Sequence, residues 1–351
     1  MRKNILFSLK NLFSSRVHLI VLLVLYLSAC SGVYADNIKW VDEINVFYPE
    51  KLYLTGLGIG ETKEKADNRA FQNISKSIKL HIKSEEFSKE EYYQTDSGEN
   101  SHTFNYDENI QIESETVLEN ASIVKHGYDS TKEMYYSLAV LRKDKYSDIL
   151  SSKIEESKEN TNRLLIAIKK EDSKVIKLGD MFRLHMESAI QQNAYTVLRT
   201  VSDNYSLHKP QPNLFEVQRM IDQFLLNEFV FSLRINGDMA DEIKMIMEDV
   251  LTTNGYYIST DSGKESDVII KGNMSIRKMP SRRDRWVILS WKFDLSFIES
   301  RNEAVILRYT LQDRQQQPSV EMARDRILYN FGKEYAEEIA ARFKQKLLHT
   351  R

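Results

Sequence analysis

An uncharged run close to the N-terminus separates the first residues of the chain from everything that can fold in water. Four basic residues and no acidic residue precede Val17–Ala29, which contains no Asp, Glu, Lys or Arg. A membrane-spanning helix needs about 20 apolar residues, and the chain becomes polar again from Asp36. A basic stretch followed by a short apolar run is typical of a secretory signal. We therefore expect residues 1–29 to be a signal peptide and the folded protein to begin after them.

The run ends with Leu27, Ser28 and Ala29 in front of Cys30, which is the only cysteine of the 351 residues. An apolar residue and two small residues before a cysteine resemble the lipobox of bacterial lipoproteins, in which the cysteine is acylated and becomes the first residue of the mature chain. Two or three acyl chains hold a protein stably on a bilayer, whereas a single chain does not. The motif predicts lipidation of Cys30, with residues 30–36 as a tether to the first domain.

Two further details bear on cleavage and location. Cleavage after Val33-Tyr34-Ala35 is a competing interpretation, and it would discard Cys30. Ser31 stands where some bacteria read an aspartate as an inner-membrane retention signal. We therefore expect the mature chain to be lipid-anchored in the outer membrane of a bacterial cell, facing the periplasm or the cell surface.

The charge of the mature chain argues against one class of partner. Removing the four basic residues before Cys30 leaves 45 Lys and Arg against 51 Asp and Glu, a formal charge of −6. Binding to nucleic acids depends on neutralising their phosphates, so we expect no nucleic-acid partner. A lipidated Cys30 also leaves no thiol for a disulfide, so the folded part must be held together by its cores.

The first folded segment, residues 37–148, contains a strand of alternating glycines. Tyr53–Gly60 reads YLTGLGIG, and a helix expected from Thr62 carries one stripe of apolar residues four positions apart, Ala66, Ala70, Ile74 and Ile78. We expect the glycines and the alanines to face each other, so that strand and helix approach closely. The glycines do not match a dinucleotide-binding fingerprint, in which the third glycine comes one residue later.

This segment resembles the LPP-twenty type of bacterial lipoprotein, which is related to the N-terminal part of flagellar assembly protein T. The resemblance is carried by Tyr53–Gly60, by the spaced alanines and isoleucines through Ile82, and by the runs at 116–118, 123–124 and 135–141. It implies a small α+β domain without established catalytic residues. Residues 85–109 depart from the pattern because they are long, acidic and polar, and we expect an extended hairpin or a loop there.

Residues 149–226 are expected to form a helical connecting domain. A largely polar helix at 143–170 ends in an apolar stretch, and prolines 210 and 212 separate a second helix at 176–201 from a third that begins near Asn213. The predicted apolar faces comprise Met181, Leu184, Met186, Ile190, Tyr195 and Leu198 in the second helix, and Phe215, Val217, Met220, Ile221 and Phe224 in the third. The methionines are interpreted as core filler.

Residues 227–351 show the clearest periodicity. Strands at 229–235, 256–259 and 267–272 and a helix at 238–254 precede two strands in which apolar and polar residues alternate. The apolar set is Trp291, Phe293, Leu295 and Phe297, then Val305, Leu307, Tyr309 and Leu311; the polar set is Lys292, Asp294 and Ser296, then Arg308 and Thr310. This alternation predicts antiparallel strands with one buried and one solvated face.

A long helix after Pro318 is expected to cover the apolar face with a stripe of Ile327, Leu328, Phe331, Tyr335, Ile339, Phe343 and Leu347. The layout resembles, by topology, the N-terminal domain of TolB and related envelope proteins. The whole chain is thus predicted to be α+β, with two small sheet domains, mainly antiparallel, joined by a helical segment.

The motifs of common enzyme and metal sites are absent from the sequence. The seven histidines are widely separated, and no HExxH, Gly-x-Ser-x-Gly or phosphate-binding loop occurs. One concentration of charge stands out, a hairpin tip expected at 277–286 that contains one acid and five basic residues. The basic residues are Arg277, Lys278, Arg282, Arg283 and Arg285. Arginine binds phosphate and carboxylate bidentately, so the tip is a candidate contact for an anionic partner, although charged turns are also common as solvated structure.

We therefore expect a non-enzymatic scaffold or assembly factor of the bacterial envelope, without cofactor or metal. Its expected partners are the membrane, through the N-terminal lipid, and an envelope protein or peptidoglycan. The alternatives are a module that binds peptidoglycan or another envelope polymer, a component of the flagellar basal body, and a hydrolase whose site is assembled across the fold.

Overall fold

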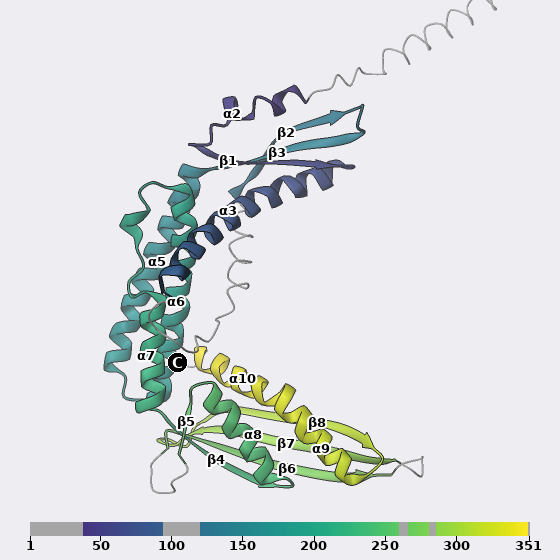
Figure 1. Ribbon diagram of the computed structural model, residues 1–351. Coiled ribbons are helices and arrows are strands. Elements are labelled where there is room, and N and C mark those ends of the chain that lie inside the picture. The colour runs from purple at the N-terminus through teal and green to yellow at the C-terminus, as the bar shows by residue number, and fades with distance from the viewer. Residues whose placement is uncertain (1–37, 94–119, 260–265, 281–285, 350–351) are drawn as a thin grey trace, which may run out of the picture. The chain divides into compact units, whose positions relative to one another are not determined.

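The computed structural model describes residues 38–93, 120–259, 266–280 and 286–349 (Figure 1). The contacts divide the chain into two compact units, one up to Tyr146 and one from Ser147. Each contains one sheet and several helices, so the predicted α+β class is confirmed. No described helix is long and apolar enough to cross a bilayer.

The first unit is a three-stranded antiparallel sheet covered on both faces. Its strands β1 (Tyr53–Gly60), β2 (Ser122–Asp129) and β3 (Met134–Arg142) lie in the order β1-β3-β2. Tyr136, Leu138 and Val140 of β3 pack against Trp40, which comes from the short helix η1 (Lys39–Val41) ahead of α2 (Ile44–Phe47). The helix α3 (Lys63–Tyr93) packs on the other face, so β3 is buried from Tyr136 to Leu141.

The predicted contact between glycines and alanines is confirmed. A methyl group added at Gly58 would lie 1.9 Å from the carbonyl oxygen of Ala66, and one added at Gly56 would lie 2.2 Å from that of Ala70. Ala66, Ala70 and Ile74 are fully buried. The glycines therefore let the backbone of β1 approach the backbone of α3 more closely than any side chain would permit.

The expectation of a loop or hairpin from residue 85 is wrong at its start. The helix α3 continues to Tyr93, and residues 94–119 lie outside the described part of the chain. Residues 85–93 are rich in Glu and Lys, which are strong helix formers in water even without an apolar face to bury. The polarity of residues 85–93 therefore does not predict where this helix ends.

The second unit begins with long helices. The helix α5 (Lys143–Lys170) enters it at Ser147 and is followed by α6 (Lys174–Val201), the short η2 (Tyr205–His208) and α7 (Leu214–Asn227). Ser173 caps α6, and Asn213 and Glu216 form a capping box at the start of α7. Most of the predicted apolar face is buried or partly buried, but Met186 and Phe215 are 49% and 75% exposed.

The sheet of the second unit is mixed. Its order is β5-β4-β6-β7-β8, in which β4 (Val230–Gly237) runs parallel to β5 (Tyr257–Ile258) and to β6 (Val268–Met279), while β7 (Val287–Glu299) and β8 (Val305–Gln317) continue it antiparallel. Parallel pairing requires a crossover connection. The helix α8 (Ala240–Thr253) supplies it between β4 and β5.

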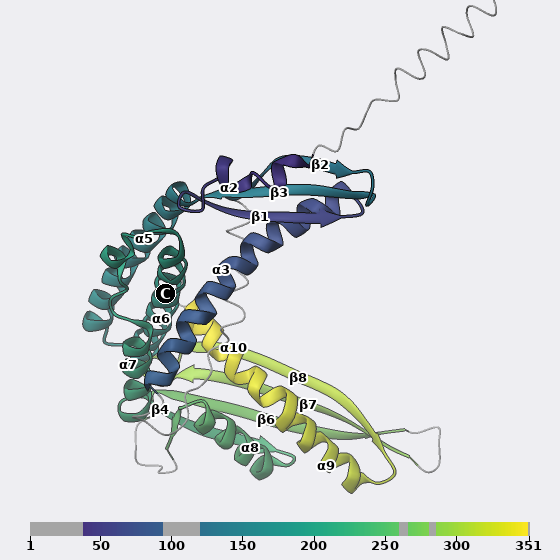
Figure 2. The same cartoon turned by 45° about the horizontal axis from the view of Figure 1, so that its top comes forward.

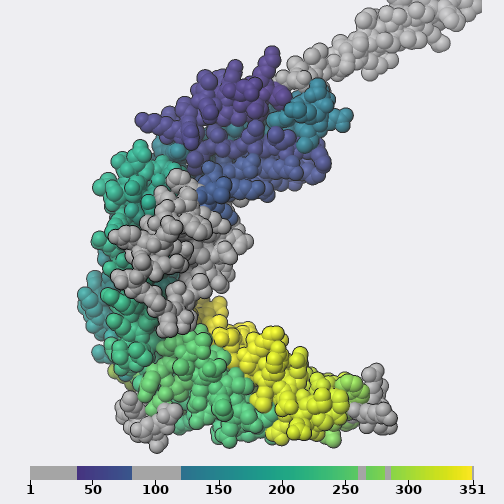
Figure 3. Space-filling model, viewed as in Figure 1, coloured from purple at the N-terminus to yellow at the C-terminus, as the bar shows by residue number. Residues whose placement is uncertain are grey.

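One face of this sheet is covered by helices, as predicted. Figures 1 and 2 show α8, α9 (Val320–Asn330) and α10 (Ala336–Leu348) on the same side of the sheet, with the π-helical turn η3 (Phe331–Tyr335) joining α9 to α10. In Figure 3 their side chains, green and yellow, make up the visible surface there. Phe293 packs edge-on against Phe331, and Phe297 stacks on Phe343. Helices α6 and α7 share this core through residues such as Leu178, Ile221 and Phe224.

The predicted alternation fails at one end of β8. Val305 is 42% exposed, whereas its neighbour Ile306 is buried. The register between β7 and β8 shifts between Phe297 and Ile298, so that one extra residue is inserted in β8. Such a bulge reverses the side-chain direction on one strand, and no sequence signal announces it here.

Gly58→Ala is expected to destabilise the first unit by at least about 2 kcal/mol, because the added methyl group would overlap the α3 backbone and neither element can retreat without losing hydrogen bonds. Hydrogen exchange at the β1 and β3 amides measures the effect. Gly332→Ala is the control, since its methyl group would meet Ile246 at an ordinary 3.6 Å. Unchanged protection in β1 and β3 of Gly58→Ala would contradict the packing.

Candidate functional site

The second sheet has one face that no described helix or strand of its own unit covers, and we call it the open face. The odd-numbered residues of β7 point towards the helices, as the contact of Trp291 with Tyr335 shows. The even-numbered residues and their partners in the neighbouring strands therefore lie on the opposite side. Side chains at the centre of that side, such as those of Asn273 and Thr310, are exposed.

The open face is strongly basic. It carries six exposed Lys and Arg side chains and a single carboxylate, that of Asp294. The bases come from four strands: Arg234 of β4, Lys271 and Arg277 of β6, Lys292 of β7, and Arg308 and Arg314 of β8. The sequence as a whole carries a formal charge of −2, so this face has the opposite sign to the chain.

The strand register brings these bases together. Arg234 lies opposite Lys271, and Lys271 lies opposite Ser296, which in turn faces Arg308. Adjacent strands are about 4.8 Å apart, and like charges directly opposite each other are destabilising. The Arg234–Lys271 pair therefore does not stabilise the sheet.

Only one of the six bases is neutralised by a described neighbour. Asp294 accepts hydrogen bonds from Lys292 Nζ at 2.6 Å and from Thr310 Oγ1 at 2.7 Å, and these bonds lower its pKa. The carboxylate is therefore ionised at neutral pH and compensates Lys292. No carboxylate among the described residues forms an ion pair with the other five bases.

The predicted basic hairpin is only partly visible. Arg277 and Lys278 are both exposed near the end of β6. They are adjacent in a strand and therefore point to opposite faces; Arg277 lies on the open face and Lys278 does not. Arg282, Arg283 and Arg285 lie outside the described residues. Arg277 thus lies beside the other bases of the open face, whereas the sequence groups it with the bases of the hairpin tip.

The predicted lipidation motif also lies outside the described residues. Leu27, Ser28, Ala29 and Cys30 precede Ile38, where the described part of the chain begins. Lipidation of Cys30 therefore stays a prediction from sequence.

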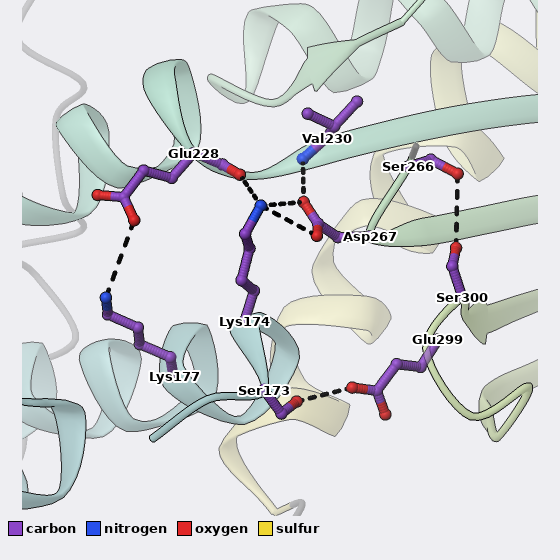
Figure 4. A network of polar contacts seen from close by, with 9 residues as sticks. All are labelled: Ser173, Lys174, Lys177, Glu228, Val230, Ser266, Asp267, Glu299 and Ser300. Carbon is purple, nitrogen blue, oxygen red and sulfur yellow. Dashed lines mark hydrogen bonds and ion pairs between the residues drawn. The ribbon is translucent and has the colours of Figure 1, made fainter. Parts of the chain in front are cut away.

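A polar cluster fastens α6 to the start of the sheet (Figure 4). The carboxylate of Asp267 accepts hydrogen bonds from the Val230 amide at 2.8 Å and from Lys174 Nζ at 3.1 Å, and Lys174 also donates to the Glu228 carbonyl at 2.6 Å. Beside it, Ser173 Oγ donates to the buried carboxylate of Glu299 at 2.7 Å. These groups satisfy one another, so the cluster joins α6, β4, β6 and β7 and is structural.

The histidines form no ligand set within the described ranges, where no group of three or more His, Cys, Asp or Glu side chains is placed to hold a metal ion. His185 of α6 is buried, with 6% of its surface exposed. Its pKa is lowered from 6.5 to about 4, first because burial disfavours the charged imidazolium and then because Lys344 is positive, while Asp222 opposes the shift. His185 is therefore neutral at pH 7.

Comparison with known proteins gives remote likenesses only. No family model matches the chain, and no curated protein matches it. A secreted protein of Helicobacter pylori is 16% identical in sequence, with 85% of this chain and 99% of that one covered and a TM-score of 0.37. A minor lipoprotein of Acinetobacter baumannii (16% identity, 34% and 92% covered, TM-score 0.24) and the rare lipoprotein B of Shewanella oneidensis (16%, 34% and 94%, 0.22) are also similar. Several neighbours are thus lipoproteins or secreted proteins, but likenesses at this level carry no argument about function.

Asp267→Ala is expected to lower the stability of the second unit by about 1–3 kcal/mol, because it leaves the Val230 amide and the Lys174 ammonium without their shared acceptor. Urea unfolding measures the loss. Glu228→Gln is the matched control, since that carboxylate makes only a long 3.9 Å contact with Lys177. An equal loss of unfolding free energy in the two variants would show that the Asp267 cluster does not stabilise the second unit.

Stability is also expected to depend on His185 in a defined pH window. Below pH 6.5 the unfolded chain binds a proton on this imidazole that the folded chain does not bind until about pH 4. The folded state therefore loses stability as the pH falls through this window, by up to about 3 kcal/mol. Unfolding midpoints measured from pH 7 to pH 4 should fall less steeply for His185→Gln than for the unsubstituted chain. Parallel curves would contradict the assignment.

Proposed function

We propose that this chain is a bacterial envelope lipoprotein, anchored through Cys30, that acts as a non-enzymatic scaffold or assembly factor. The observation that carries the proposal is the sequence Leu27–Cys30 at the end of a basic, then apolar, N-terminal stretch that contains the only cysteine of the chain. A serine at position 31, where an aspartate would signal retention in the inner membrane, supports the outer membrane as the location of the chain. An envelope protein or peptidoglycan is the proposed partner, besides the membrane itself.

Features of the folded units support a binding role rather than a reaction. The internal polar groups around Lys174, Asp267 and Glu299 are engaged in holding elements together. Among the described residues, the basic open face is an exposed cluster of charge that is suited to contact with a surface. Neither unit depends on a disulfide, because the single cysteine is at residue 30.

The lipidation is tested by expressing the full chain and its Cys30→Ala variant in a bacterium supplied with a labelled fatty acid. The unsubstituted chain should take up label and sediment with membranes, whereas Cys30→Ala should remain an unlabelled precursor. Ser31→Ala is the control and should be labelled normally. A mature N-terminus at Asp36, with no label incorporated, would show cleavage after Ala35 and would remove the anchor.

A further inference from the structure

We infer that the open face binds the surface of a phospholipid bilayer that contains anionic lipids. The face is a single layer of side chains presented by four paired strands, and its bases are spread over it. Lys271 and Arg277 are six residues apart on β6, which corresponds to about 20 Å along the strand. Arg234 and Arg308 lie three strands apart in the same register row, which corresponds to about 15 Å across the sheet. Charges spread over such an area can meet a planar array of anions together.

The side chains between the bases distinguish a bilayer from other polyanions. The centre of the face is made of small hydrogen-bonding residues, Asn236, Asn273, Thr310, Ser275 and Ser290. It carries no aromatic side chain on which nucleotide bases could stack. The apolar side chains of this face lie at its two ends, Ile269, Ile298 and Val305 at one end and Met279 and Ile288 at the other. A specific protein interface has an apolar core with aromatic anchors near its centre and is depleted of lysine, whereas the centre of this face is polar.

The unpaired state of the bases fits a surface contact. Five of them have no carboxylate partner among the described residues, so they can approach anionic headgroups without first losing an ion pair. Each Lys or Arg close to an anionic leaflet raises partitioning about fivefold, and the attraction reaches about 10 Å at an ionic strength of 0.1 M. The contribution of several bases on one plane is therefore substantial, although the chain is acidic as a whole.

The inference does not depend on acylation of Cys30, and its test uses a chain that lacks that residue. Residues 31–351 contain every described residue and omit only the predicted signal peptide and its cysteine. This chain is mixed with vesicles of phosphatidylcholine and phosphatidylglycerol in equal parts, or of phosphatidylcholine alone, and the bound fraction is measured by sedimentation at low and at high salt.

Two triple variants of equal charge separate the open face from the general charge of the chain. The open-face variant combines Arg234→Gln, Lys271→Gln and Arg308→Gln. The control variant removes three exposed bases from helices α7, α8 and α9: Arg219→Gln, Lys244→Gln and Arg324→Gln. Circular dichroism and thermal unfolding establish that both variants fold.

The unsubstituted chain should bind the anionic vesicles, lose most of this binding at high salt, and bind phosphatidylcholine vesicles far less. The open-face variant should bind about 100-fold more weakly, and the control variant should bind within about threefold of the unsubstituted chain. Failure to bind anionic vesicles, equal binding to both vesicle types, or an equal loss in the two variants would each overturn the inference.

Discussion

The alternation of apolar and polar residues along β7 is the constraint on which the second unit depends. Because successive side chains of a strand point to opposite faces, Trp291, Phe293 and Phe297 must all be covered together, and the terminal helix supplies that cover through Phe331 and Phe343. The same periodicity places Lys292 and Asp294 on the opposite side. The same alternation of side chains therefore produces both the apolar core on one face of the sheet and the basic open face on the other.

The first unit meets a different constraint. Its sheet has three strands within the described residues, and a sheet of this size needs a packed apolar face or a helix against it to be stable. Trp40 covers one face of β3, and the close approach of β1 to α3 covers the other. The glycines of β1 are required for backbone contact, which explains a pattern that otherwise invites a nucleotide-binding interpretation.

Much of this architecture can be predicted from local sequence, and the remainder depends on pairing between distant segments. The Gly58–Ala66 contact and the buried stripe of the terminal helix follow from side-chain periodicity. Three other features do not follow from periodicity, because each depends on tertiary context or on register. They are the continuation of α3 to Tyr93, the parallel pairing of β4 and the bulge that buries Ile306. The candidate surface was missed for the same reason. Its members Arg234, Lys271 and Arg308 are far apart in sequence, and only the strand register makes them neighbours.

Two membrane contacts are proposed for one chain, a lipid anchor at Cys30 and a basic sheet face that contacts a bilayer by itself. The most direct test of the second contact is a spin label placed on the chain of residues 31–351, which has no native cysteine. A label at Asn273 on the open face should become protected from a water-soluble relaxation agent when anionic vesicles are added, whereas a label at Arg324 on α9 should not. Protection at Arg324 alone, or equal exposure of both positions on bound protein, would contradict the account.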